Sequence, residues 1–134
     1  MIERSLFGPE HIAFRDSYQR FAEKEIAPHH EAWEEQGYVD REVWRKAGAN
    51  GFLCMTMPEQ YGGAGVSYVA YGLVAREVER VDSGYRSAMS VQSSLVMYPI
   101  YAFGSEEQKM KYLPGMARGE IVGCFGLTEA DGGS

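Results

Sequence analysis

One stretch of the chain, residues 83–103, constrains the fold more than any other part of the sequence. Arg86 is its only ionised residue, and the apolar residues around it indicate a helix from about Ser83 to Tyr101. A helix with so little charge has no broad polar face that could contact water. We therefore expect most of the circumference of this helix to be buried.

Helical patterns also cover most of the remaining chain. From Pro9 to about Ile26, apolar residues at spacings of three and four form one stripe: Phe14, Tyr18, Phe21, Ala22 and Ile26. Pro28 disturbs this helix, and the pattern resumes weakly until Gly37 ends it. Further helices are predicted from an N-cap at Asp40 to Gly51, from an N-cap at Ser67 to Val81, and from a capping box at Ser105–Gln108 to about Pro114.

Residues 52–57 form an apolar stretch that leads into a glycine-rich loop. Gly62, Gly63 and Gly65 occupy three of four consecutive positions there. This spacing indicates a backbone that needs unusual dihedral angles or a close approach to its neighbours. The loop lacks the GxxxxGK[ST] pattern, so it is not expected to bind phosphate as a P-loop does.

The pattern changes near the end of the chain. Residues 121–128 resemble a buried strand, and residues 129–134 resemble a loop. A single terminal strand has no partner within this chain. The predicted fold class is therefore all-α, an antiparallel helical bundle over residues 1–119. Residues 120–134 are expected to be the first strand of a truncated β domain.

Composition excludes several classes of function. The net charge of −6 argues against broad nucleic-acid binding, and no apolar run reaches the roughly 18 residues needed to cross a bilayer. The two cysteines, Cys54 and Cys124, have apolar neighbours and no CxxC spacing. They are expected to be buried thiols rather than a disulfide or a metal site. No secretory signal pattern is present at the start, so a soluble protein from a reducing compartment is expected.

Arg86 is the residue most open to a functional interpretation. A guanidinium in an apolar helix is costly unless it is paired, and it cannot lose its charge. In one interpretation it forms a buried ion pair with Glu79, seven residues earlier, and holds two helices together. In the other, Arg86 faces a cavity and binds a substrate carboxylate, with Ser90 one turn further along the same face.

Other polar residues give weaker signals. Residues 92–94, Gln-Ser-Ser, either satisfy helix carbonyls or line a pocket. His29 and His30 are adjacent, and adjacent helical residues point about 100° apart. They are therefore expected at a solvated helix end, and no metal site is predicted.

The last third of the chain resembles the acyl-CoA dehydrogenase family. Residues 104–114 are similar to a family segment that precedes a signature strand, and Cys124-Phe-Gly-Leu-Thr-Glu129 is similar to that signature. Ala130 stands where the family usually has Pro. The resemblance implies FAD as cofactor, and it places the following residues at the flavin, the last also near acyl-CoA: Phe125, Leu127, Thr128, Gly133 and Ser134.

Residues 81–94 are similar to the glutaryl-CoA dehydrogenase branch of this family. In that branch, the residues that match Arg86 and Ser90 bind the distal carboxylate of the substrate, and the residue that matches Glu79 lies nearby. The likeness to this branch extends from about residue 63 onward. Residues 29–33 and 43–48 instead resemble dehydrogenases of longer, uncharged acyl chains.

The resemblance implies α,β-desaturation of an acyl thioester, in which a glutamate removes the α-proton and hydride passes from the β-carbon to the flavin. In the glutaryl branch, decarboxylation to crotonyl-CoA follows. The glutamate belongs to a carboxy-terminal helical domain outside this chain. We therefore assign no catalytic residue here, and the chain alone is expected to be inactive.

The resemblance also implies a homotetramer and electron-transfer flavoprotein as the electron acceptor. The expected location is the cytoplasm in a bacterium or the mitochondrial matrix in a eukaryote. Two alternatives stay open at this point. One is a dehydrogenase or oxidase of uncharged acyl chains, with Arg86 purely structural; the other is a helical interaction module without catalysis.

Overall fold

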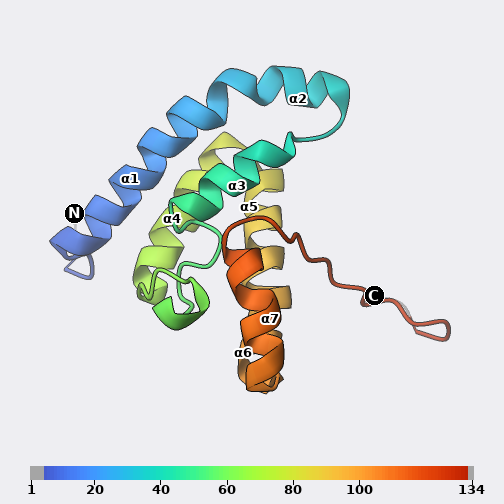
Figure 1. Cartoon of the computed structure of the whole chain (residues 1–134). Helices are drawn as coiled ribbons and strands as arrows, with labels where there is room; N and C mark the ends of the chain where they lie inside the picture. Colours follow the sequence, from blue (N-terminus) through green and yellow to red (C-terminus); the bar gives the residue numbers. More distant parts are fainter. Residues whose placement is uncertain (1–4, 133–134) are drawn as a thin grey trace.

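Helices make up most of the part of the chain that the computed structural model describes, residues 5–132 (Figure 1). Two 3₁₀ turns and one π-helical segment accompany seven α-helices in this part. In chain order the elements are α1 (Pro9–Glu25), η1 (Ala27–His29), α2 (His30–Gln36), α3 (Arg41–Ala49), η2 (Glu59–Tyr61), α4 (Tyr68–Val81), α5 (Ser83–Ser90), the π-helical η3 (Val91–Met97), α6 (Tyr98–Phe103) and α7 (Glu106–Ala117). This order confirms the predicted all-α class.

Most helix ends follow the predicted capping signals. The Ser67 hydroxyl accepts a hydrogen bond from the Ala70 amide at the start of α4. Ser105 and Gln108 make both bonds of the predicted capping box at the start of α7. Gly37 adopts a φ of 80° and ends α2, a conformation that glycine adopts without strain.

Two helix ends differ from the prediction. Asp40 occupies the N-cap position of α3, but its side chain makes no capping bond. It accepts a hydrogen bond from Gln36 instead. The last helix does not end near Pro114, because α7 contains Pro114 and continues to Ala117. Proline removes one N–H from the helix, and the burial of Leu113 and Ala117 keeps the last turn helical.

The helices pack in sequence-adjacent and crossing pairs. α1 packs against α4, and α4 packs against α5. α5, η3 and α6 follow one another without a break and form one rod in Figure 1. After a short turn, α7 runs back beside α6, so these two helices are antiparallel.

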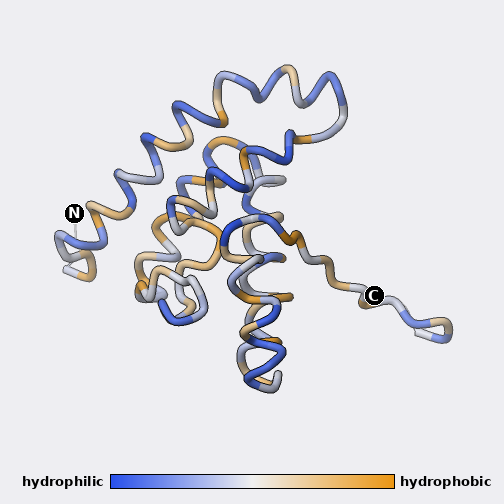
Figure 2. The backbone as a smooth tube through the Cα atoms, in the orientation of Figure 1, coloured by the Kyte–Doolittle hydropathy of each residue, from blue (hydrophilic) through white to orange (hydrophobic). Residues whose placement is uncertain are grey.

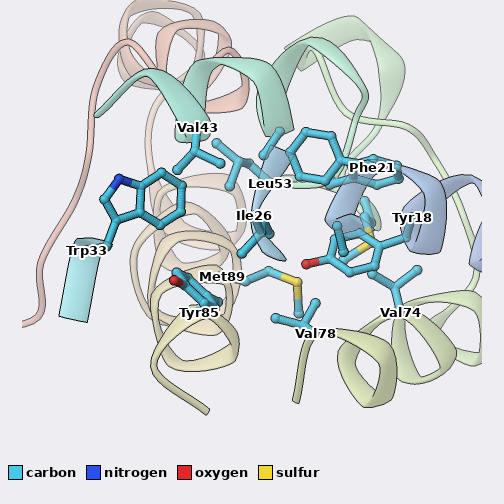
Figure 3. Packing of buried hydrophobic residues seen from close by; sticks show 14 residues of the cluster. Tyr18, Phe21, Ile26, Trp33, Val43, Leu53, Val74, Val78, Tyr85 and Met89 are labelled. Carbon is cyan, nitrogen blue, oxygen red and sulfur yellow. The ribbon is translucent and has the colours of Figure 1, made fainter. Parts of the chain in front are cut away.

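A first apolar core lies between α1, α3, α4 and α5 (Figure 3). Phe52, from the loop after α3, is at its aromatic centre. Its ring lies 5.0 Å from that of Tyr18, 5.2 Å from that of Phe21 and 5.7 Å from that of Phe14. Other buried members are Ile26, Trp33, Val43, Leu53, Val74, Val78, Tyr85 and Met89.

A second, smaller core lies between η3, α7 and the loop that contains η2. Its buried members are Cys54, Met57, Tyr61, Met97, Leu113, Met116 and Ala117. Residues 52–57 supply both cores, because Phe52, Leu53 and Met55 enter the first and Cys54 and Met57 enter the second. This apolar stretch is therefore a buried loop that joins the two cores.

The glycine-rich loop has the backbone features that its sequence predicts. Gly62 and Gly65 have φ values of 88° and 61°, in the left-handed region. Gly63 instead allows a close approach, because a Cβ at this position would overlap the carbonyl group of Met57. The loop therefore packs its own backbone against residues 54–57.

Replacing Gly63 by Ala is expected to lower the free energy of unfolding by about 1–3 kcal/mol, because the added methyl group forces the Met57 carbonyl away. Gly72→Ala is the matched control. Gly72 lies inside α4 with open space at its Cβ position, so alanine there is expected to add about 0.5–1 kcal/mol. Urea unfolding of both variants, followed by circular dichroism, measures the difference. Equal midpoints for the two variants would contradict the close packing of this loop.

The low-charge rod buries less of its surface than the sequence predicts. Its buried residues are Tyr85, Met89, Gln92, Ser93 and Met97, which lie along one side. Leu95, Tyr98 and Phe103 are exposed within the described residues. The expectation that most of the circumference is buried is therefore wrong for this chain, since only one side of the rod has helical neighbours here.

The predicted buried strand is also absent from the described structure. Residues 122–128 belong to no helix or strand, and the only bridge described nearby is an isolated one between Glu129 and Gly132. Residues 124–128 are exposed, including Cys124, which was expected to be a buried thiol. A strand needs a second strand to pair with, and the described residues supply none for this segment. Figure 2 shows its hydrophobic residues along a tail that leaves the helices.

Candidate functional site

Three predicted site residues meet where α4 joins α5. Glu79 lies near the end of α4 and Arg86 near the start of α5. Asp82 caps α5, with its carboxylate accepting a 2.6 Å hydrogen bond from the Gly84 amide. Across this sharp turn, Nε of Arg86 donates a 2.6 Å hydrogen bond to the Glu79 carboxylate.

Ser90 completes the cluster one helical turn after Arg86. The Arg86 guanidinium donates from Nη1 to the Ser90 hydroxyl at 3.3 Å and from Nη2 to the Ser87 hydroxyl at 3.4 Å. The Ser90 hydroxyl in turn donates to the Ser87 carbonyl at 3.1 Å. Among the described residues, Arg86 thus uses one N–H of each of its three nitrogens, and two of its five N–H groups are left for a ligand.

The Arg86–Glu79 pair is accessible to solvent. The two side chains are 40% and 48% exposed. The predicted ion pair between Arg86 and Glu79 is therefore present and links α4 to α5, but its expected burial is wrong for the described structure. An exposed pair of this kind contributes at most about 1 kcal/mol to stability. An accessible guanidinium beside an accessible hydroxyl can bind an anion, and a carboxylate matches its planar donors.

Gln92 is a buried polar residue of the π-helical segment η3, and it binds backbone groups at the end of α7 and just after it. Its Nε2 donates to the carbonyls of Met116 at 3.0 Å and Ile121 at 2.8 Å. Its Oε1 accepts from the Gly123 amide at 2.8 Å. Sequence reasoning missed this role, and the only available signal was a long amide side chain within a nearly uncharged helix.

The neighbouring serines behave differently from Gln92. The Ser93 hydroxyl donates to the Met89 carbonyl at 2.8 Å, which confirms that this residue satisfies a helix carbonyl. Ser94 is exposed. The tripeptide therefore contains one residue that binds its own helix and one that binds a segment distant in sequence.

The predicted flavin-contacting residues lie on the exposed tail. Phe125 and Leu127 have 52% and 58% of their surfaces exposed, and Thr128 is exposed as well. Among the described residues, no backbone hydrogen bond involves residues 124–128. Gly133 and Ser134, predicted at the flavin and the substrate, lie outside the described residues.

The two adjacent histidines make different contacts. His29 is exposed and lies with its ring 5.4 Å from that of Trp33. His30 forms a 3.0 Å hydrogen bond between its Nδ1 and the Tyr85 hydroxyl, so it does not belong to a fully solvated helix end. No group of three possible metal ligands occurs within residues 5–132. Burial raises the pKa of the Cys54 thiol to about 12, which makes that thiol unreactive.

Glu77 is a buried carboxylate on α4, and sequence reasoning missed it. Burial alone would raise the pKa of its carboxyl, but hydrogen bonds from Gln19, Arg76 and Arg80 together hold that pKa below its usual value. The three donors lie 2.9–3.1 Å from the Glu77 oxygens. Glu77 therefore stays ionised and ties α1 to α4, whereas Glu79 on the same helix remains exposed beside Arg86.

Comparison with known proteins decides the family. Residues 8–120 match the family described as acyl-CoA dehydrogenase, N-terminal domain. The chain belongs to the acyl-CoA dehydrogenase family. The match covers every helix of the described structure and includes Glu79, Arg86 and Ser90.

Individual relatives of this family act on different acyl chains according to their names. The chain is 37% identical over 131 residues to the mitochondrial long-chain specific acyl-CoA dehydrogenase of Sus scrofa, covering 98% of this chain and 30% of that protein. It resembles the structure of glutaryl-CoA dehydrogenase from Mycobacterium smegmatis with 47% identity and a TM-score of 0.90, covering 97% of this chain and 34% of that one. The structure of a glutaryl-CoA dehydrogenase from the same organism, in complex with FADH2, is 42% identical with a TM-score of 0.90. The match covers 96% of this chain and 33% of that one.

The chain spans about a third of the length of the relatives that it matches. It corresponds to the N-terminal part of an acyl-CoA dehydrogenase. No helix among residues 5–132 has both the length and the apolar character needed to cross a membrane.

Proposed function

We propose that this chain is the substrate-carboxylate-binding part of an FAD-dependent dehydrogenase that oxidises and decarboxylates glutaryl-CoA to crotonyl-CoA. One observation carries the proposal: Arg86 and Ser90 are hydrogen-bonded to each other on one face of α5, with the guanidinium 40% exposed. The helical bundle would comprise residues 1–119, and residues 120–134 would begin a β domain.

The Arg86 cluster fits a dicarboxylic acyl chain. The two remaining N–H groups of the guanidinium offer donors to the distal carboxylate of glutaryl-CoA. The Ser90 hydroxyl becomes a third donor when its single O–H turns from the Ser87 carbonyl to the carboxylate. Glu79 fixes Nε of Arg86 and thereby holds the guanidinium plane in place. The Glu79 carboxylate also lowers the free-energy cost of holding the charged Arg86 side chain in this site when no substrate is bound.

The tail fits the edge of a flavin. Residues 124–128 have backbone N–H and C=O groups without backbone partners among the described residues, and the Thr128 hydroxyl is exposed beside them. A planar heterocycle with alternating donors and acceptors can satisfy such a segment. FAD, when bound, accepts the hydride from the substrate. Phe125, Leu127, Thr128, Gly133 and Ser134 are proposed as flavin contacts, and Ser134 also as a substrate contact.

The remaining assignments follow from the family. The catalytic glutamate is proposed to lie in a segment outside this chain, so the 134-residue chain alone would not turn over acyl-CoA. A homotetramer and electron-transfer flavoprotein as acceptor are proposed for the whole enzyme. The proposed location is the cytoplasm in a bacterium or the mitochondrial matrix in a eukaryote, as the name of the Sus scrofa relative supports.

A dehydrogenase of longer, uncharged acyl chains is the second candidate. The identity of 37% with a long-chain specific enzyme favours it. In that case Arg86 would only join α4 to α5 through Glu79, as the exposed pair already does. The two candidates differ in the charge of the acyl chain that they accept.

The test is a comparison of two substrates with the purified full-length protein that contains this chain. We expect kcat/KM for glutaryl-CoA to exceed that for butyryl-CoA at least about tenfold. A single charge-assisted hydrogen bond that stabilises the transition state by about 1.4 kcal/mol gives a ratio of this size. A flavin absorption band in the same sample checks the cofactor independently. Equal or better turnover of butyryl-CoA would favour the second candidate.

A further inference from the structure

The amide of Gln92 meets the tail as a neighbouring strand would. Its Oε1 accepts a hydrogen bond from the Gly123 N–H, and its Nε2 donates one to the Ile121 carbonyl. The two bonds therefore lie on either side of Val122. In an extended chain, the C=O of one residue and the N–H of the second residue after it point to the same side. One residue of a parallel neighbouring strand makes this same pair of bonds. Gln92 thus supplies one rung of a β ladder from a helix.

The remaining contacts fix the tail at the same place. Gly123 lies so close to η3 that a Cβ would stand 2.5 Å from a methyl carbon of Val96. Val122 is one of the residues that line a small pocket with Trp44, Leu53, Ala88 and Gln92. Arg41 donates to the Glu120 carbonyl at 3.0 Å. After α7 the chain leaves the helices as a tail (Figure 1), and residues 124–128 are exposed.

Both polar atoms of the buried Gln92 side chain are engaged in hydrogen bonds to backbone groups. The residue is 4% exposed, its carbonyl oxygen and amide nitrogen both have backbone partners, and no buried side-chain polar atom lacks a partner in the described structure. It also lies in a π-helical segment, a rare conformation that is frequent at functional sites. Two of its three bonds hold Ile121 and Gly123, and the third joins the same side chain to Met116 in α7. The buried amide therefore positions residues 121–123 against the end of α7.

We infer that Gln92 is a positioning residue that sets the direction and register of residues 125–128 at the flavin without touching the flavin itself. The inference rests on the proposed FAD site. Gln92 lies two residues after Ser90 on one continuous rod, so the same element carries the carboxylate-binding residues and the start of the flavin-contacting segment. The start of η3 therefore sets the distance between the carboxylate-binding residues and the flavin-contacting segment.

The test uses the full-length FAD-containing protein and the substitution Gln92→Met, which keeps the length of the side chain and removes all three hydrogen bonds. Ser94→Ala, at an exposed position of the same π-helical segment, is the control. Hydrogen exchange of the peptide that contains Gly123 is expected to become about tenfold faster in Gln92→Met, because the loss of a buried hydrogen bond opens the segment. The dissociation constant for FAD is expected to rise about tenfold, and the control should change neither quantity.

A second variant keeps the inference testable if Gln92→Met folds poorly. Gly123→Ala drives the same segment away from Val96 and leaves Gln92 unchanged, so it should also weaken FAD binding. Unchanged protection at Gly123 in Gln92→Met, or faster exchange with FAD affinity unchanged, would overturn the inference. A wild-type protein that binds FAD but prefers butyryl-CoA would refute only the proposed substrate, because neither readout involves the acyl chain.

Discussion

Replacing Arg86 by Met in the full-length enzyme is expected to lower kcat/KM for glutaryl-CoA by about 100-fold or more. The substitution removes the positive charge and two free N–H groups, and a charge-assisted bidentate contact with a carboxylate accounts for about 2.7 kcal/mol or more of transition-state stabilisation. Butyryl-CoA has no distal carboxylate, so its kcat/KM should change by less than about threefold. Steady-state assays with both substrates measure the two effects.

Arg45→Met is the matched control for this substitution. Arg45 is also a half-exposed helical arginine in an ion pair, with Glu42 at 3.3 Å, but it lies on α3 away from the α4–α5 turn. Neither substrate should respond strongly to its loss, because an exposed pair of this kind has little effect. Equal losses on both substrates in Arg86→Met would show that Arg86 acts only on the structure.

Replacing Phe52 by Ala is expected to destabilise the 134-residue chain by about 3–5 kcal/mol, since it leaves a cavity among packed aromatic rings. Phe52 is 2% exposed and touches the rings of Phe14, Tyr18 and Phe21. Loss of this side chain removes the contact between the buried loop and α1. Urea unfolding followed at 222 nm gives the change in the free energy of unfolding.

Phe103→Ala makes the same chemical change at a position that is 86% exposed. It should shift the free energy of unfolding by no more than about 0.5 kcal/mol, the usual limit for surface positions. A loss in Phe52→Ala no larger than that in Phe103→Ala would contradict the placement of Phe52 at the centre of the first core.

Local signals predicted the helices well because their causes are local. The capping box at Ser105 needs only residues 105–108, and the stripe from Phe14 to Ile26 needs only one helix face. Pro114 was misleading because the burial of the last turn of α7 offsets the helix hydrogen bond that proline cannot make. The extent of burial of the rod was overestimated, since burial depends on neighbours that no local pattern specifies.

The tail was predicted as a strand on the same local grounds, and here they were insufficient. Apolar residues from Ile121 to Leu127 favour an extended backbone, and the structure assigns residues 122–128 to no helix or strand. A strand also requires a second strand to pair with, which the described residues do not provide. The exposed position of Cys124 has the same cause.

The candidate site was predictable only in part. Arg86 and Ser90 are four residues apart, so helical geometry alone places them together. Glu79 lies across one short turn and was also within reach of this reasoning. Gln92 binds partners 24 to 31 residues away, and no spacing rule connects a helix interior with the chain that follows another helix.

The loop that joins the two cores has a consequence for cooperativity. Leu53 and Cys54 are neighbours along the chain, yet they enter different cores. If one cluster opens, the loop must move, and it then withdraws side chains from the other cluster. The pairs α1–α4 and α6–α7 are therefore not independent folding units, although they have few direct contacts with each other. Two small clusters that are each too modest to be stable alone thus melt as one all-or-none domain.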